Sequence, residues 1–308
     1  MLLVAAVLVL QETAPAAEST PPPPRDVTAA TLADPKALAA LEAPGTVLFH
    51  DEFESDASFA QWFEVRGKDD GRVAIEHDPK LVRTGMGSIR CVAPARDGAS
   101  SGSGASAWLG ADGYDCVHFR RWIRFADDYD QGNLNHTGGG LAAVAGTGKW
   151  DAMGSAGIRP TGADHFTAGF EPWRDWGKNR APGAMASYVY WMDMERDKDG
   201  HWWGNLFAPD AEHRVNPERG RWVCLEQRIR VNTVGKADGE LATWIDGKLY
   251  QHLVGFRWRT DAKVRLKRFD VGIYVHHAER TNTVWYDDVV VSTGYVGTGA
   301  ETKPPSAK

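Results

Sequence analysis

Cysteine is scarce in this 308-residue sequence, which contains only Cys91, Cys116 and Cys224. Three cysteines cannot all pair within one chain, so the protein is not expected to be a small domain held together by several disulfides. No Cys-x-x-Cys pair or His/Cys cluster indicates a zinc site. Two arrangements stay open: a single bridge between Cys91 and Cys116, or three buried thiols.

Positive charge is not in excess either. The 35 Lys and Arg residues are outnumbered by 41 Asp and Glu residues, and the formal net charge is −6. A nucleic-acid-binding protein would be expected to present a basic face, so no nucleic-acid partner is predicted. The sequence shows no internal repeat, coiled-coil pattern or nucleotide-binding loop, and no organic cofactor is expected.

Long apolar segments are also missing. The run Leu2–Leu10 is apolar throughout but too short to span a bilayer, and no other segment is apolar enough to do so. Small residues follow at Ala14–Ala17, as in the cleavage region of a signal peptide. We therefore expect residues 1–18 to be a signal peptide and the mature protein to be secreted or periplasmic.

The remaining chain divides into three expected parts. Residues 19–45 contain four consecutive prolines and then Asp34-Pro35, which resembles an N-cap followed by Pro at the first helical position. They are expected to be a Pro-rich linker and a short helix. Residues 46–296 are expected to form one domain, because all-β sandwiches of about 250 residues are often single units. A monomer is also expected. Residues 297–308 are small, polar and Pro-rich, and are expected to be disordered.

Alternation of apolar and polar residues is clearest between Arg219 and Val291. Asp246-Gly247 divides one alternating run into two halves, and an Asp-Gly pair in this position is typical of a tight hairpin. Antiparallel strands with one wet and one buried face make sandwiches and jelly rolls. The predicted strands are Val47–Phe53, Val73–Glu76, Ser88–Val92, His118–Phe125, His165–Glu171, Ala186–Asp193, Trp222–Asn232, Glu240–Ile245, Lys248–Val254, Arg268–His276 and Thr283–Val291.

A glycine-rich stretch lies between the fourth and fifth of these strands. Residues 132–148 include the segment Asn135-His136-Thr137 followed by three glycines. Such a stretch either approaches another backbone closely or forms a mobile loop. The chain also has 13 Trp residues, whose flat apolar faces suit stacking on sugar rings.

Several segments resemble a known group of enzymes. They are Trp222-Val223-Cys224-Leu225-Glu226-Gln227, Asp238-Gly239, Trp244-Ile245-Asp246-Gly247, Phe256-Arg257-Trp258-Arg259, Tyr188-Val189-Tyr190 and Trp285-Tyr286-Asp287-Asp288-Val289. In this order they resemble polysaccharide lyases of the alginate and glucuronan lyase type, families 14 and 20 and their relatives. The resemblance implies an all-β fold, a concanavalin A-like jelly-roll sandwich of two antiparallel sheets, here with a short N-terminal helix. It also implies a groove for an acidic polysaccharide and cleavage by β-elimination.

The sequence departs from that group at two places. Relatives often carry a Lys in the glycine-rich segment, where this chain has Asn133-Leu134-Asn135-His136. A Ser-x-Arg pair expected on the strand before the tyrosines is replaced by Thr167-Ala168-Gly169-Phe170-Glu171. The residues that would carry out the reaction must therefore be chosen from this chain's own side chains.

Elimination on a uronate needs a group that neutralises the carboxylate, a base and an acid. Tyr188 and Tyr190 are the candidate base and acid, because strand side chains repeat every second residue; the alternative is a pair of core tyrosines. His136 is the candidate base or carboxylate partner, with Asn135 as its neutral neighbour. Arg159 is the candidate neutralising cation, unless it is a solvated loop residue.

Seven further residues are candidates for binding, five for substrate and two for a metal ion. Glu171, Trp122, Arg120, Glu226 and Arg228 are predicted to contact substrate, although alternating charges on a strand are more usually a solvated face. Related jelly rolls often bind calcium near the first and last strands. Glu54 and Asp288 are therefore the candidate ligands of a structural calcium ion, with ordinary surface acids as the alternative.

Two other functions fit the same sandwich. A glycoside hydrolase would use two carboxylates, such as Glu171 and Glu226. A non-catalytic carbohydrate-binding protein would need only an aromatic groove. An exported lyase acting on a uronic-acid-containing polysaccharide is the function that the resemblance favours.

Overall fold

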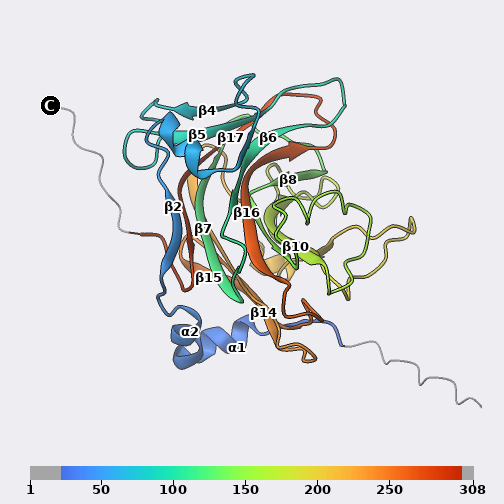
Figure 1. The fold of residues 1–308 in the computed structure, drawn as a ribbon. Coiled ribbons are helices and arrows are strands. Elements are labelled where there is room, and N and C mark those ends of the chain that lie inside the picture. Colours follow the sequence, from blue (N-terminus) through green and yellow to red (C-terminus); the bar gives the residue numbers. More distant parts are fainter. Residues whose placement is uncertain (1–21, 300–308) are drawn as a thin grey trace, which may run out of the picture.

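The computed structural model describes residues 22–299, so the predicted signal peptide and most of the predicted C-terminal tail lie outside the described residues. Within this range, no helix combines the length and the apolar character needed to cross a membrane. Two antiparallel β-sheets make up nearly all of the structure (Figure 1). This confirms the predicted sandwich.

Sheet A has nine strands and contains the first and last strands of the chain. Its order is β1-β15-β14-β13-β7-β17-β5-β4, and β2 also pairs with β17. The strands are β1 (Arg25–Asp26), β2 (Val47–Asp51), β4 (Val73–Glu76), β5 (Ser88–Ala93), β7 (Cys116–Phe125), β13 (Trp222–Arg230), β14 (Gly239–Ile245), β15 (Lys248–Phe256) and β17 (Asn282–Ser292).

Sheet B has eight strands drawn mainly from the middle of the chain. Its order is β12-β11-β10-β9-β16-β6-β3, and β8 also pairs with β16. The strands are β3 (Glu64–Arg66), β6 (Ser101–Trp108), β8 (Asn135–Thr137), β9 (Gly140–Val144), β10 (His165–Trp173), β11 (Ala184–Tyr190), β12 (Asn205–Phe207) and β16 (Arg265–Val275).

The helices are short and peripheral. Helices α1 (Thr28–Ala33) and α2 (Pro35–Leu41) lie at one end of the sandwich, beside β14 and β15 (Figure 1). Asp34 caps α2 by accepting a hydrogen bond from the Lys36 amide, and Pro35 takes the first helical position. Two 3₁₀ helices, η1 (Asp56–Gln61) and η2 (Ala211–His213), lie within connections.

The hydrophobic core lies between the two sheets. On β7, the predicted inward face is observed: Phe119, Ile123 and Phe125 are fully buried. Phe170 of β10 and Phe269 of β16 meet them from sheet B. Burial of these apolar faces from water is the main force that holds the sheets together.

The Asp246-Gly247 pair forms the tight turn that the sequence predicts. Both residues have positive φ, 50° and 75°, as a two-residue hairpin turn requires. They connect β14 and β15 directly, with Ile245 paired to Lys248. This turn fixes the register of the hairpin and therefore which residues of β14 and β15 face the core.

Of the two arrangements that the sequence left open, the structure has three free thiols and no bridge between Cys91 and Cys116. Cys91 points into the core from β5, while Cys116 begins β7 on the other side of β17 in sheet A. Cys224 is buried on β13, and Cys116 is only half-buried. Burial raises the pKa of Cys91 and of Cys224 to about 12.

We predict that all three thiols are alkylated by a maleimide in denaturant without any reductant. In the folded protein, Cys91 and Cys224 should react far more slowly than a free thiol, because they are buried and protonated. Intact mass spectrometry counts the adducts. Three adducts in denaturant and few in the folded state are expected, whereas a single adduct in denaturant would reveal a disulfide.

Candidate active site

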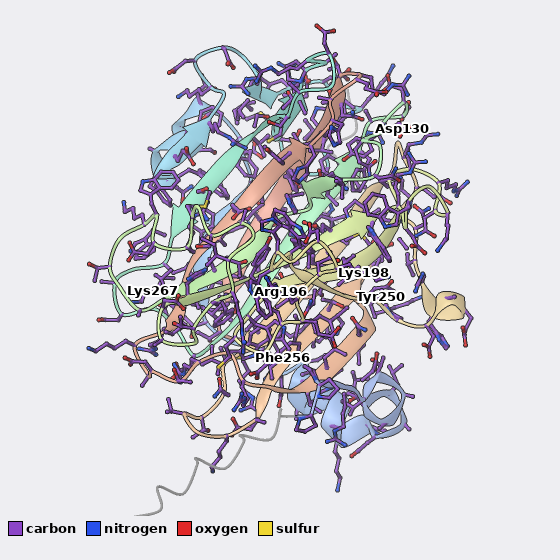
Figure 2. All side chains as sticks on the ribbon, turned by 90° about the vertical axis from the view of Figure 1, so that its right-hand side faces the viewer. Asp130, Arg196, Lys198, Tyr250, Phe256 and Lys267 are labelled. Carbon is purple, nitrogen blue, oxygen red and sulfur yellow. The ribbon has the colours of Figure 1, made fainter. Side chains whose placement is uncertain are left out.

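A cleft of about 510 Å³ lies on the outer face of sheet B. Figure 2 looks toward this sheet, whose strands cross the view diagonally behind the loop that carries Arg196 and Lys198. The cleft is lined by residues of β6, β9, β10, β11 and β16, by His136 of β8, and by Trp150 and residues 152–156 of a loop. The residues that line it come from distant parts of the sequence and are brought together by strand pairing.

Strand register gives the cleft a floor without side chains. In one row across the sheet, Tyr188 lies opposite Gly169, Gly169 opposite Gly140, and Gly140 opposite Asp270. Directly paired residues share a face, so the two glycines leave a trough between the tyrosine and the aspartate. A Cβ atom on Gly169 would lie 3.1 Å from a carboxylate oxygen of Glu171. The glycine therefore leaves room for that carboxylate.

His136 and Glu171 form an ion pair in the cleft. The His136 Nδ1 atom lies 3.1 Å from Oε1 of Glu171, and the histidine side chain is 43% exposed while that of the glutamate is 10% exposed. Desolvation disfavours the charged imidazole, but attraction to Glu171, the hydrogen bond and the more distant Asp270 outweigh it. Together they raise the pKa of His136 above its ordinary value.

A second histidine completes this arrangement. The Nε2 atoms of His136 and His276 lie 3.2 Å apart, so one of them donates to the other. Burial, together with repulsion from His136 and His277, lowers the pKa of His276 to about 4. His276 is therefore neutral at pH 7, and the raised pKa of His136 favours the arrangement in which His136 donates from both ring nitrogens and His276 accepts.

The two candidate tyrosines lie beside this pair. The hydroxyl oxygens of Tyr188 and Tyr190 are 3.4 Å apart, and the Tyr188 ring lies 5.2 Å from the His136 ring. The Tyr188 hydroxyl also accepts a hydrogen bond from the Gly204 amide. Burial and the neighbouring Tyr190 hydroxyl raise the pKa of Tyr188 well above its ordinary value, so this phenol keeps its proton at neutral pH.

Gly138 and Gly139 fix the position of His136. Both have positive φ, 128° and 82°, and a Cβ on either would lie 2.4 Å from the backbone oxygen of a neighbouring strand. The glycine-rich segment is therefore a close backbone approach, the first of the two predicted alternatives. The Gly138 carbonyl accepts a hydrogen bond from the buried Arg121 guanidinium, and its amide donates to the Tyr286 hydroxyl.

Arg159 does not line the cleft, contrary to its predicted role. Its side chain is exposed, its Nε donates to the Met192 carbonyl at 2.5 Å, and its guanidinium lies over the Trp202 ring. Gly157 forms an isolated bridge with Trp202. Arg159 thus connects two loops, because its contacts are with the loop after β11 and not with the trough.

Asn135 also lies outside the cleft lining. It is buried, and its side-chain amide donates to the Pro172 carbonyl at 3.1 Å. Alternation along β8 explains this, since His136 points outward and its neighbours Asn135 and Thr137 point inward. Asn135 connects β8 to β10 beneath the histidine.

Four predicted substrate-binding residues lie on the wrong sheet for this cleft. Arg120 and Trp122 are on β7, and Glu226 and Arg228 are on β13, both in sheet A. Their side chains alternate with core residues and so face away from sheet B. Glu226 is buried, and its carboxylate accepts hydrogen bonds from His118 and from the amides of residues 296 and 297. Arg228 pairs with Glu240.

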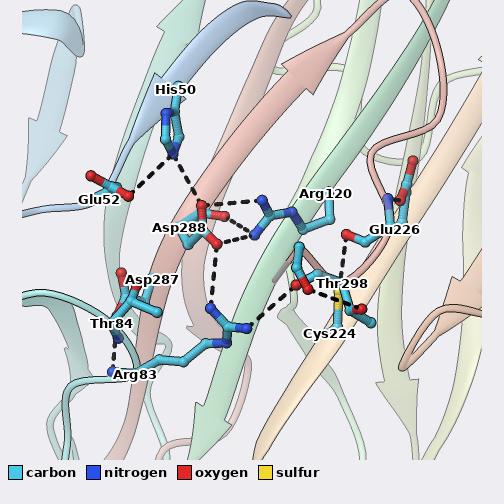
Figure 3. Close-up of polar contacts among 12 residues, drawn as sticks. His50, Glu52, Arg83, Thr84, Arg120, Cys224, Glu226, Asp287, Asp288 and Thr298 are labelled. Carbon is cyan, nitrogen blue, oxygen red and sulfur yellow. Dashed lines mark hydrogen bonds and ion pairs between the residues drawn. The ribbon is translucent and has the colours of Figure 1, made fainter. Parts of the chain in front are cut away.

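The two predicted calcium ligands, Glu54 and Asp288, contact different partners. The Glu54 carboxylate accepts hydrogen bonds from the Met86 amide. Asp288 instead lies with His50 and Glu52 (Figure 3). Each of these three residues offers one possible metal-ligand atom, and the three atoms lie within 4.8 Å of one another. Two arginines already contact Asp288, Arg120 at 2.6 Å and Arg83 at 3.4 Å. This donor set does not fit a calcium ion, which favours oxygen ligands whose charge is not already compensated.

Sequence reasoning missed most of the β16 contribution. Arg268, Asp270 and Tyr274 line the cleft together with His276, and Arg268 donates to the Ser106 hydroxyl at 2.8 Å. The sequence did contain a pattern that groups them, because these four residues are two or four positions apart in the predicted strand Arg268–His276 and therefore share one face. The alternation did not say which sheet face would be hollowed.

We predict that His136 titrates above pH 6.5 and His276 well below it in histidine NMR spectra. Replacing Glu171 by Gln should lower the His136 pKa, since the attraction that favours the imidazolium is removed. Stability contributed by the pair should be complete below the unfolded-state pKa of about 6.5 and lost as pH rises through the folded-state value. The arrangement would be refuted by a His136 resonance that titrates below its ordinary value.

No protein-family model matches the sequence, and a search of curated proteins gives no match. Solved structures do match. Alginate lyase vAL-1 from Chlorella virus has a TM-score of 0.57 at 15% identity, covering 76% of this chain and 93% of its own. The PL-14 alginate lyase from Aplysia kurodai has a TM-score of 0.57 at 14% identity, covering 80% and 98%. The endo-β-1,4-glucuronan lyase from Trichoderma reesei has a TM-score of 0.51 at 14% identity, covering 85% and 100%. The expected resemblance to these lyases is thus confirmed in the fold.

Proposed function

We propose that the protein is an exported polysaccharide lyase that cleaves a uronic-acid-containing polysaccharide by β-elimination in the cleft on sheet B. The observation that carries the proposal is the His136–Glu171 pair beside the two tyrosine hydroxyls, above a floor of glycine. Export rests on the signal-peptide pattern of the sequence. The fold shared with alginate and glucuronan lyases supports the choice of substrate class.

His136 is assigned to the substrate carboxylate. Removal of the proton at C5 leaves negative charge on the adjacent carboxyl group, and a fixed cation lowers the energy of that enolate. Glu171 favours the protonated form of His136 and holds the ring through Nδ1, while Nε2 points to neutral His276. A substrate carboxylate that displaces His276 would receive a charge-assisted hydrogen bond from Nε2.

Tyr190 and Tyr188 are assigned to the proton transfers. Tyr188 keeps its proton, so it is the acid that protonates the departing glycosidic oxygen. Tyr190 is assigned as the base, whose deprotonated oxygen takes the C5 proton; the C5–H and C4–O bonds break and a C4–C5 double bond forms. The new Tyr190 hydroxyl then returns its proton to the Tyr188 phenolate across their 3.4 Å contact, which restores both groups.

The hydrolase alternative loses the carboxylate pair on which it was based. Glu171 lines the cleft on sheet B, whereas Glu226 is buried under the outer face of sheet A. Two carboxylates that flank one glycosidic bond are about 5 to 9.5 Å apart, and residues on different sheets that face opposite ways do not meet this condition. A protein that only binds carbohydrate remains the alternative for the experiment to exclude.

We predict that Tyr188→Phe and Tyr190→Phe each lower the rate of elimination by about a hundredfold or more, because each removes a proton-transfer group. The measurement is the ultraviolet absorbance of unsaturated uronate ends, using alginate, glucuronan and polygalacturonate. Tyr114→Phe is the matched control, since Tyr114 packs against the core away from the cleft. It should keep full activity.

Three other results would contradict the assignment. Undiminished turnover in both cleft variants would show that the tyrosines are not the acid and base. New reducing ends without ultraviolet absorbance would indicate hydrolysis. Binding of uronate polymers with no cleavage by the wild-type protein would indicate a carbohydrate-binding protein.

A further inference from the structure

A second hollow, of about 610 Å³, lies on the outer face of sheet A, across the sandwich from the cleft. Its lining is dominated by arginine and tryptophan. The principal residues are Arg83, Trp122, Arg124, Arg221, Trp222 and Asp246. None of them takes part in the proposed reaction.

Strand pairing builds an alternating row of rings and cations at this hollow. Arg124 of β7 lies opposite Trp222 of β13 on one side and opposite Trp285 of β17 on the other. Trp122 lies on the same face of β7, two residues before Arg124. The arginine side chain is therefore flanked by indoles, and it stays 16% exposed.

Arg83 forms another edge of the hollow. Its guanidinium lies 3.6 Å from the Trp122 ring centroid, a stacked cation–π contact. Asp288 and the Thr298 carbonyl hold it there, each at 3.4 Å (Figure 3). The Trp122 ring is thus fixed by packing, as a preformed binding surface requires.

Arginines outnumber acids in the lining of the hollow, although exposed acids at its rim also contact two of them: Asp127 lies 3.4 Å from Arg124 and Glu218 lies 3.9 Å from Arg221. Asp246, which pairs with Arg221 at 2.8 Å, is the one acid among the described lining residues, against three arginines. Asp288 is shared by two arginines and by His50. Burial raises the pKa of nearby Asp287 to about 7, so that carboxyl adds less than a full negative charge at neutral pH.

Arginine and tryptophan side by side match one kind of ligand well. The guanidinium fork binds a carboxylate through two parallel hydrogen bonds, and the indole face packs against the apolar face of a sugar ring. Arg221 is 50% exposed and can turn toward a ligand. A polysaccharide whose sugar units each carry a carboxylate offers both a group for the arginines and an apolar ring face for the tryptophans, repeated along its chain.

We propose that the hollow on sheet A is a second binding site for an acidic, carboxylate-bearing polysaccharide, separate from the cleft. The ligand class rests on the proposed function. Because the two sites face opposite ways, one short oligosaccharide does not fill both. A polymer held at the second site raises the local concentration of chain segments near the cleft.

The test uses the Tyr188→Phe protein, so that the ligand is not cleaved. Calorimetric titration with short oligouronates should show two classes of site. Arg221→Glu should weaken one class by roughly tenfold or more, since it replaces a charge-assisted contact by repulsion. Arg25→Glu, the same change at an exposed residue on the far edge strand of sheet A, is the matched control and should leave both classes unchanged.

Activity of the otherwise wild-type protein gives a second measurement. Arg221→Glu should slow cleavage of long polymer and leave cleavage of short oligomers unchanged, because the cleft is intact. Trp222→Ala should act in the same direction. Thermal unfolding of each variant checks that the sheet is preserved.

The outcomes separate this inference from the proposed function. One class of sites in Tyr188→Phe, unaffected by Arg221→Glu, would overturn the second site while elimination in the cleft still stands. Arg221-dependent binding by a protein that cleaves no uronate would support the second site and refute the lyase. A sulfated glycan without carboxylates that binds more tightly than the uronates would overturn the assignment of a carboxylate ligand.

Discussion

The buried guanidinium of Arg121 is the contact on which the candidate site depends. Arg121 extends from β7 into the space between the sheets, is fully buried, and donates to the carbonyls of Gly138, at 2.5 Å, and Phe170, at 3.0 Å. Desolvation lowers its pKa to about 10, so it stays charged at neutral pH. Those carbonyls belong to the turn between β8 and β9 and to β10, the segments that carry His136 and Glu171. A buried guanidinium is stable only where its N–H groups have acceptors, so Arg121 requires these carbonyls to stay in place. The turn itself is held by the hydrogen bonds that Arg121 donates to it.

The sandwich separates two kinds of chemistry on its outer faces. On sheet B, glycines at paired positions remove side chains from the floor, and titratable groups stand at its sides. On sheet A, long side chains cover the strands, and most charges are compensated, as Asp288 is by Arg83 and Arg120. A floor of glycine gives a polymer access to functional groups, whereas a surface of arginine and tryptophan offers contact area. This difference explains why proton transfer is assigned to one face and retention of the polymer to the other.

Much of the fold could be predicted from the sequence, and less of the site. Alternation located eleven strands, and the Asp246-Gly247 turn has the positive φ values that its residues require. The strands β6 and β9 were missed because Ser101–Trp108 and Gly140–Val144 consist mostly of small residues without an apolar period.

Alternation also cannot tell which sheet a strand joins. Tyr188 and Trp122 have the same kind of pattern, yet one faces the cleft and the other the opposite side of the molecule. Arg121 was hidden for a related reason, since a charged residue at an inward position contradicts the rule that located its neighbours.

The protonation of the site could not be predicted because it depends on contacts between distant residues. His136 lies 35 positions from Glu171 and 140 from His276 in the sequence, and β16 pairs with β8 to bring the two histidines together. Two imidazoles 3.2 Å apart do not both carry a proton charge at neutral pH, because the repulsion between them is too large. Glu171 decides which one is charged, since it contacts only Nδ1 of His136. The histidine whose charged form is favoured thereby lies beside the Tyr188 ring, and its partner is the neutral ring of His276. A glutamate on β10 therefore promotes positive charge in the cleft indirectly, by favouring the protonated form of the neighbouring histidine.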